Sequence, residues 1–275
     1  MITGDTIARR TKEFTVKIIV LIKQVPDTWS DRHIDTATGL IDRAGSDRVI
    51  DEISERALEV ALTHKDGDKT TEIVVMTMGP PEAKDSLRKA LAMGADSAVH
   101  ISDEGLRGAD ALLTSSLIAA AARATGFDLL IAGNESTDGR GGVMPAMLAE
   151  HLELPVLSFL DEVHLDAGGP DGFRVRGRRS GDAGTTELSA TLPAVISITE
   201  QLPDARFANF KGIMSAKKKP VLAYNLADFA AAPTDARSAV LTAEQRPPRS
   251  GGTVVVDDGH AAIELADYLA TARLI

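Results

Sequence analysis

The apolar positions in the first half of the chain follow two alternating spacings. Short, nearly continuous apolar runs are typical of buried parallel strands, and they cover residues 15–23, 72–78, 97–101 and 127–132. Helical spacing or helix end signals cover residues 51–65, 81–94, 110–125 and 143–152. Alternating strands and helices favour parallel pairing through right-handed crossovers. We therefore predict an α/β fold with a doubly wound, mostly parallel, Rossmann-like sheet.

Two details refine this prediction. Residues 24–29 are expected to form a loop, and residues 32–43 a small hairpin that turns at Thr38 and Gly39. Asp51 or Ser54 is suited to cap the first helix, and Gly67 to end it.

The pattern changes after Glu153. Short strands separated by Gly and Asp turns are predicted at 154–159, 162–165, 173–178, 187–191 and 194–199. We expect them to form an antiparallel extension of the same sheet. A loop and a short basic helix follow from Gln201, then a linker rich in Ala, Pro, Thr and Arg at about 230–252, and a last helix at 261–274. Such a tail has too little core of its own, so we expect it to pack on a partner chain.

Composition excludes several classes of function. The 275 residues include no cysteine, which excludes disulfides, thiol catalysis and Cys-ligated metal centres, so any redox role needs a bound cofactor. The formal net charge of -10 disfavours nonspecific nucleic-acid binding. No apolar stretch reaches the roughly 18 residues that a membrane span needs. We expect a soluble protein that binds no nucleic acid and is not embedded in a membrane.

The first 14 residues carry three basic side chains together with Asp5 and Glu13, and no apolar run follows them. This pattern argues against a secretory signal and favours a disordered extension over a mitochondrial presequence. The expected location is the bacterial cytoplasm, with the mitochondrial matrix as the alternative.

A glycine-rich segment is the main candidate for chemistry. Residues 133–142 (GNESTDGRGG) lie between the fourth strand and the next helix. At the carboxyl edge of an open α/β sheet, such a loop offers backbone N–H groups to a phosphate. Its spacing matches neither G-x-G-x-x-G nor the Walker A motif, and a flexible surface turn is the alternative. Asp138 is suited either to cap the following helix or to hold a ribose hydroxyl.

Other side chains give weaker signals. The histidines at 33, 64, 100, 151, 164 and 260 lack metal-ligand spacing and are expected at the surface or in turns; we assign no metal site and no catalytic residue. Trp29 is suited to stack on a flavin or adenine, or to act as a half-buried anchor. Phe207 and Phe210 with flanking cations indicate either an interaction hot spot or a core-facing pair.

Several segments, in this order, resemble the beta subunits of electron-transfer flavoproteins, the FixA family. The resemblance runs from about Lys17 to Ile275. Its segments are VLIKQVPD, DEISERALEVAL, GPPEAKDSLRKALAMGAD, the GNESTDG loop, LPAVISITEQLPDARF and GIMSAKKK. It implies an adenine nucleotide alpha hydrolase-like fold and a heterodimer with an alpha subunit. It also implies one redox-active FAD, shared with and held mainly by alpha, and a structural AMP bound by beta.

The resemblance implies an electron carrier without substrate turnover of its own. Such a carrier takes electrons from acyl-CoA dehydrogenases and other dehydrogenases and passes them to the respiratory chain through electron-transfer flavoprotein–quinone oxidoreductase. One alternative is a bifurcating type with a second FAD in the beta site. Another is a stand-alone nucleotide-binding protein of the universal-stress type, which shares this fold.

The resemblance also assigns sites and regions. The implied AMP or adenylate site contains Leu21, Asp51, Glu52, Ile53, Ser54, Met78, Gly133, Asn134, Glu135, Ser136, Thr137, Asp138, Gly139, Arg140, Gly141, Gly142, Val143 and Met144. Thr28 and Ile53 are implied near the flavin, although neither is aromatic as in some relatives. Partner docking is implied for Arg206, Phe207, Phe210, Ile213 and Met214, with Phe210 as the anchor. The regions are a disordered extension (1–14), a nucleotide-binding domain (15–200), the recognition loop and basic helix (201–229), and a linker and arm packing on alpha (230–275).

Overall fold

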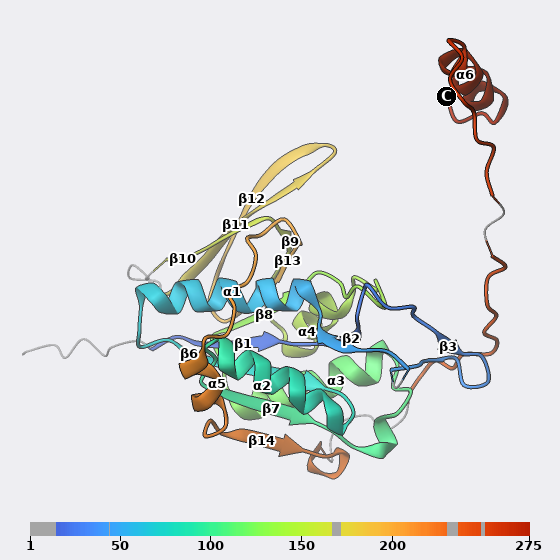
Figure 1. Ribbon diagram of the computed structural model, residues 1–275. Helices are drawn as coiled ribbons and strands as arrows, with labels where there is room; N and C mark the ends of the chain where they lie inside the picture. Colours follow the sequence, from blue (N-terminus) through green and yellow to red (C-terminus); the bar gives the residue numbers. More distant parts are fainter. Residues whose placement is uncertain (1–14, 44, 167–171, 230–235, 249–250) are drawn as a thin grey trace, which may run out of the picture.

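A seven-stranded parallel sheet forms the centre of the computed structural model, which describes residues 15–43, 45–166, 172–229, 236–248 and 251–275 (Figure 1). In spatial order its strands are β14 (Val221–Tyr224), β7 (Ser97–Ile101), β6 (Glu72–Met78), β1 (Lys17–Leu21), β8 (Leu129–Gly133), β13 (Ala194–Ile198) and β9 (Val156–Leu160). The order places β1 between β6 and β8, so their carboxyl ends meet at one edge.

Helices cover both faces of this sheet. The four helices are α1 (Glu52–Gly67), α2 (Lys84–Met93), α3 (Ala111–Thr125) and α4 (Met144–Leu152). Ile18 and Val20 of β1 pack with α1 and α2, whereas Ile19 packs with α3 and α4. Side chains of a strand point alternately to opposite faces, so a nearly continuous apolar run is needed to fill both layers. The predicted doubly wound α/β fold is confirmed.

The antiparallel part differs from the prediction. The strands β10 (Glu162–Asp166), β11 (Arg174–Gly181) and β12 (Gly184–Thr191) form a separate three-stranded sheet, while β9 and β13 join the parallel sheet. Gly177 of β11 packs against β9, because a Cβ atom there would lie 2.6 Å from Leu160 Cδ1. The antiparallel strands therefore lie over the end of the main sheet instead of extending it.

Smaller elements complete the edge where the carboxyl ends meet. The predicted hairpin is present as β3 (Ile34–Asp35) and β4 (Leu40–Ile41), with Gly39 at a φ of 70° in its turn. Residues 24–26, predicted as loop, form β2 (Gln24–Pro26) and pair with β5 (Arg48–Ile50). Asp51 is the N-cap of α1, which continues through Gly67. Single 3-10 turns lie at Pro81–Ala83, Glu104–Leu106 and Leu226–Phe229.

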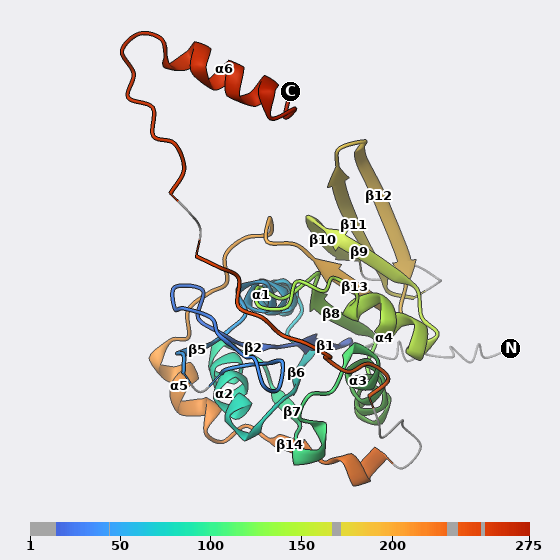
Figure 2. The ribbon, with the colours of Figure 1, turned by 90° about the vertical axis from the view of Figure 1, so that its right-hand side faces the viewer.

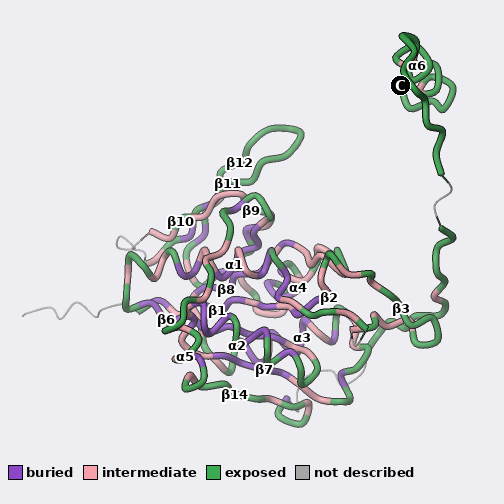
Figure 3. Tube along the Cα trace, viewed as in Figure 1, coloured by how far each residue is buried: buried purple, intermediate pink, exposed green. Residues whose placement is uncertain are grey.

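The C-terminal third contains a short helix, a strand and an arm. Helix α5 (Phe210–Ala216) packs on α2, and β14 adds an edge strand that the apolar pattern did not predict. The arm then leaves the body and ends in α6 (Ala261–Thr271), which has no buried residue (Figures 2 and 3). The predicted extension at 1–14 lies outside the described residues. In the part of the chain that is described, no helix is long and apolar enough to cross a membrane.

Candidate functional site

The glycine-rich loop and the first helix meet at the carboxyl edge of the sheet. Strands β1, β6 and β8 end there at Leu21, Met78 and Gly133, and α1 begins beside them. A Cβ atom on Gly133 would lie 2.9 Å from Ile53 Cγ2, so glycine permits this close approach of the loop to α1. The structure therefore brings together the segments that sequence analysis assigned to one adenylate site.

Asp51 fixes the loop to α1. Its side chain is only 1% exposed, and its Oδ1 accepts a hydrogen bond from Ile53 N at 3.1 Å. Its Oδ2 accepts from Thr137 N at 2.6 Å and from Thr137 Oγ1 at 2.8 Å. One carboxylate thus caps the helix and holds the loop 86 residues away in sequence.

Asp138 lies inside an ion-pair cluster. Its side chain is 3% exposed, with Oδ1 2.7 Å from Lys23 Nζ and Oδ2 3.7 Å from an Arg43 nitrogen. Burial by itself raises the pKa of Asp138. The charge and hydrogen bond of Lys23, with hydrogen bonds from Ser136 and Gly139, outweigh burial and hold that pKa below its usual range. Helix α4 has no side-chain cap, so the interpretation of Asp138 as its cap is wrong.

Three cations around this loop were missed by sequence analysis. Lys23 and Arg43 face Asp138, and the Arg32 guanidinium donates to Thr137 O, to Thr137 Oγ1 at 3.2 Å and to Pro26 O at 2.9 Å. The position of Lys23, at the end of the first predicted strand, was a usable signal for this edge. The two arginines flank the small hairpin, and their proximity to the loop depends on how that hairpin folds back.

Several polar groups at this edge are available to a ligand. Asn134 is buried, and its Oδ1 has no hydrogen-bond partner among the described residues. Pro145 lies in the first turn of α4, whose N-terminal N–H groups receive no side-chain cap. Cβ atoms on Gly141 and Gly142 would meet nothing within 4 Å. Free N–H groups at a helix N-terminus suit a phosphate, and an unpaired amide oxygen suits a donor group of a ligand.

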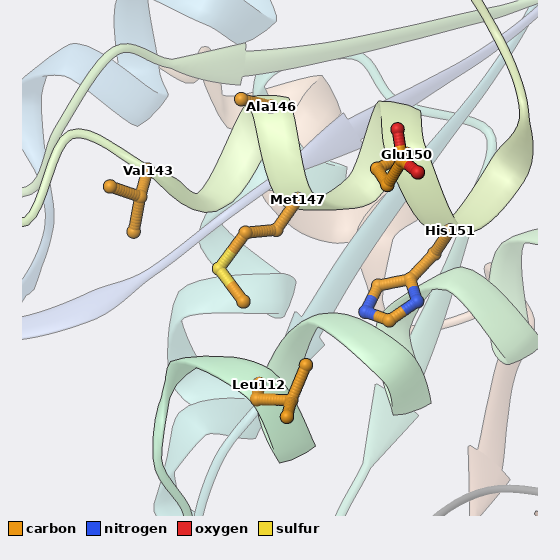
Figure 4. Close-up of a pocket in the computed structure, with 6 residues that line it drawn as sticks. All are labelled: Leu112, Val143, Ala146, Met147, Glu150 and His151. Carbon is orange, nitrogen blue, oxygen red and sulfur yellow. The ribbon is translucent and has the colours of Figure 1, made fainter.

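An apolar groove adjoins the loop. It has a volume of about 410 Å³, and its lining residues are Leu112, Val143, Ala146, Met147, Glu150 and His151. Figure 4 shows Leu112 of α3 and Met147 of α4 on its two sides. Ser115 Oγ lies 3.1 Å from His151 Nε2 at its base. Except for Glu150 and His151 the lining is apolar, so the groove suits an apolar contact better than a phosphate.

The two positions implied near a flavin differ in exposure. Ile53 is buried under Gly133, whereas Thr28 is exposed. The neighbouring Trp29 is 96% exposed, so the interpretation as a half-buried anchor is wrong for this chain by itself. Stacking of Trp29 on a cofactor stays a prediction.

The segment implied in partner docking has exposed apolar side chains. Phe207 is 97% and Phe210 80% exposed, and Ile213 and Met214 are also exposed. The core-facing interpretation of the two phenylalanines is therefore wrong. Arg206, in contrast, is turned inward and forms ion pairs with Glu59 and Asp66.

Comparison with known proteins identifies the family. A family model described as "Electron transfer flavoprotein domain" matches residues 38–229. The "Electron transfer flavoprotein subunit beta" of Mycobacterium tuberculosis (strain ATCC 25618 / H37Rv) is 42% identical over 268 residues, which cover 94% of this chain and 99% of that protein. The chain belongs to the electron transfer flavoprotein beta-subunit family.

Two further relatives are more distant. The "Electron transfer flavoprotein subunit beta" of Megasphaera elsdenii is 32% identical, with 94% of this chain and 100% of that protein covered. The "Caffeyl-CoA reductase-Etf complex subunit CarD" of Acetobacterium woodii is 35% identical, with 79% and 81% covered. The family resemblance drawn from the sequence is thus confirmed. Electron transfer flavoproteins carry out flavin-linked electron transfer, and a beta subunit implies a companion subunit.

The histidines of this electron transfer flavoprotein subunit are not all superficial. His100 is buried in β7, with Nε2 3.2 Å from Gly79 O, contrary to the expectation of a surface or turn position. Burial holds the pKa of His100 below its usual range, against the effect of hydrogen bonds to Gly79 and Pro80. Within the described residues, no group of three or more His, Asp or Glu side chains is arranged to hold a metal ion.

Proposed function

We propose that this beta subunit binds AMP at the carboxyl edge of its sheet and forms, with an alpha subunit that holds FAD, a carrier of electrons between dehydrogenases and a quinone oxidoreductase. The observation that carries the nucleotide assignment is the uncapped N-terminus of α4 directly after the glycine-rich loop, together with the unpaired, buried Asn134 Oδ1 at the start of that loop. Buried polar groups are rarely left without partners, so this oxygen calls for a ligand donor.

The residues fit an adenylate in a simple way. The N–H groups of residues 141–144 would hold the phosphate, because those of Gly139 and Arg140 already donate to Asp138 Oδ1 and Ser136 O. Asn134 would accept from an adenine or ribose donor. Lys23, Arg32 and Arg43 keep the loop in place and make this edge more positive. Asp51 and Thr137 are already bonded to each other, so their role is to brace the loop. The other residues assigned to the site line the same edge in this proposal.

The electron-carrying role belongs to the assembled dimer. FAD supplies the redox chemistry when bound, and this chain contributes positioning and docking, without substrate turnover of its own. The exposed side chains of Phe207 and Phe210 support docking of acyl-CoA dehydrogenases and other donors on the 206–214 segment. The exposed α6 supports packing of the 230–275 arm on the alpha subunit. The four-region division and a cytoplasmic location are part of the same proposal.

Quantifying bound nucleotide tests the proposal. The chain is co-expressed with its alpha subunit, and the purified dimer is denatured and analysed for AMP and FAD. We expect one of each per dimer. Two FAD and no AMP would favour the bifurcating alternative, and no adenylate besides the FAD of alpha would contradict the beta site.

A matched pair of variants locates the ligand. Asn134→Leu should lower AMP occupancy while leaving the FAD of alpha in place, because it removes the free oxygen at similar side-chain size. Asp182→Asn, in the turn between β11 and β12, is the control and should leave AMP unchanged. Equal AMP content in both variants would exclude Asn134 from the site.

A further inference from the structure

An ion-pair cluster ties the docking segment to α1. Arg206 N donates to Glu59 Oε2 at 2.9 Å, and Arg206 Nε donates to Oε1 at 3.0 Å and Oε2 at 2.9 Å. Arg206 Nη2 lies 2.7 Å from Glu59 Oε1 and 2.8 Å from Asp66 Oδ2. We name Arg206, Glu59 and Asp66 the Arg206 clamp. Because its guanidinium is engaged in these contacts, Arg206 does not point outward as a docking side chain would.

A second arginine holds the residues just before Arg206. Arg56 of α1 donates to Leu202 O and lies 2.5 Å from Asp204 Oδ1. Ala205, which lies between Asp204 and Arg206, and Ala208, which follows Phe207, pack against the apolar core. The backbone is thus held on both sides of Phe207.

The other end of the segment is fixed to α2. A Cβ atom on Gly212 would lie 2.1 Å from Ala92 O, so α5 lies directly against the α2 backbone. Lys219 Nζ donates to Leu91 O at 2.9 Å and to Ala95 O at 2.6 Å, where α2 ends. Asn209 caps α5 through Gly212 N at 2.8 Å. The two exposed phenyl rings therefore lie between two anchored ends.

We propose that Arg206 and Glu59 are positioning residues, and that the Arg206 clamp holds residues 207–214 in the conformation that a donor dehydrogenase binds. The inference rests on the proposed docking function of this segment. A segment that is ordered before the encounter loses less conformational entropy on binding. The clamp acts on Phe207 and Phe210 through the backbone and contacts no partner itself.

The experiment uses the flavin-loaded dimer and three variants, Glu59→Gln, Arg206→Gln and the double variant. Asp85→Asn, at an exposed position in the first turn of α2, is the control; it changes the net charge as Glu59→Gln does and in the opposite sense to Arg206→Gln. The first measurement is the rate of chymotrypsin cleavage after Phe207 and Phe210. We expect each single variant to be cleaved about tenfold faster than the wild type. The double variant should be cleaved no faster than the single variants, since the two residues act as one unit.

The second measurement is electron transfer from an acyl-CoA dehydrogenase reduced by its acyl-CoA substrate, chosen as one that reduces the wild-type dimer. We expect KM for the dehydrogenase to rise about fivefold to tenfold in the clamp variants, with kcat changed by less than about twofold, since docking is weakened while the flavin is untouched. Arg206→Lys keeps the positive charge but loses the forked guanidinium group. Its KM for the dehydrogenase should therefore lie between those of the wild type and Arg206→Gln.

The two claims fail separately. The positioning role is wrong if the clamp variants keep wild-type cleavage rates, or if they are cleaved faster while KM stays unchanged. In either case, a raised KM for Phe210→Ala still supports docking on this segment. If Phe210→Ala also leaves KM unchanged, docking on this segment is wrong as well. A fall in flavin content or dimer yield in both single variants, but not in Asp85→Asn, would assign the clamp to assembly and overturn the inference.

Discussion

Replacing Asp51 with alanine tests whether one carboxylate braces the nucleotide loop. The cap on Ile53 N contributes about 1 kcal/mol. Each of the two hydrogen bonds from Thr137 to the charged acceptor contributes about 1.5–3 kcal/mol. With water entering the space left by the side chain, the lower end of these ranges applies, and Asp51→Ala is expected to cost roughly 4 kcal/mol. That is a large part of the roughly 5–15 kcal/mol that stabilises a folded domain.

Urea denaturation of the dimer, followed by far-UV circular dichroism at fixed protein concentration, measures this cost. With a slope of about 3 kcal/mol per molar urea, the midpoint should fall by more than about 1 M. Asp110→Ala is the control, because Asp110 also caps a helix, α3, and also holds a distant segment through Arg237 N, Ser238 N and Ser238 Oγ, but at a more exposed position, where water replaces the lost bonds. It should lower the midpoint less, and if the two variants lower the midpoint equally, the reasoning that the buried Thr137 bonds to Asp51 add stability is refuted.

Three further predictions concern single groups. Gly133→Ala should lower the thermal midpoint by the equivalent of about 1–3 kcal/mol, since the new Cβ would lie 2.9 Å from Ile53 Cγ2. The control Gly141→Ala places its Cβ in open space and should leave the thermal midpoint unchanged within error. Equal shifts in the two variants would contradict the close approach of Gly133 to Ile53. Phe210→Ala should weaken dehydrogenase binding by about 1.5–3 kcal/mol with AMP content unchanged, and unaltered transfer kinetics would exclude it as the anchor. Burial raises the pKa of Glu59, but Arg206 more than offsets this and holds it below 4.5, so the clamp is fully formed above pH 4.5 and is lost as pH falls through the lower folded pKa. Hydrogen exchange of residues 206–214, corrected for the intrinsic rate, should accelerate only in that acidic window. Glu59→Gln should reduce this pH dependence to the part carried by Asp66, whose pKa the hydrogen bond of Arg206 also holds below its usual range.

The central fold could be predicted because its strands are buried on both faces. Strands 72–78 and 97–101 were located to the residue, since each apolar run is bounded by polar residues, Gly or Pro. Strand β14 was missed because four residues at a partly exposed edge, after three lysines and Pro220, leave almost no pattern. The separation of β10–β12 from the main sheet was missed for a different reason: apolar spacing shows that a strand exists, but pairing depends on contacts between distant segments.

The position of the candidate site in the fold could be predicted from its backbone chemistry. The glycines of the 133–142 loop and their place after a strand were enough to locate the edge. The clustering of Lys23 and Asp138, which are 115 residues apart, depends on the tertiary fold. Trp29 was misjudged because a large aromatic side chain is normally assigned to a core, whereas the core of this chain lies elsewhere. The orientation of the Arg206 side chain toward α1 could not be predicted either. A cation next to exposed phenylalanines has the same sequence pattern whether it faces a partner or α1.

The exposed arm has a consequence for the life of the chain in the cell. Helix α6 has no buried residue, and the extended stretch before it exposes Val254 and Val256. A newly made copy that has not met its companion therefore offers proteases an accessible apolar end. We expect unpaired copies to be degraded first, so that the amount of this subunit follows the supply of its partner without any dedicated regulator.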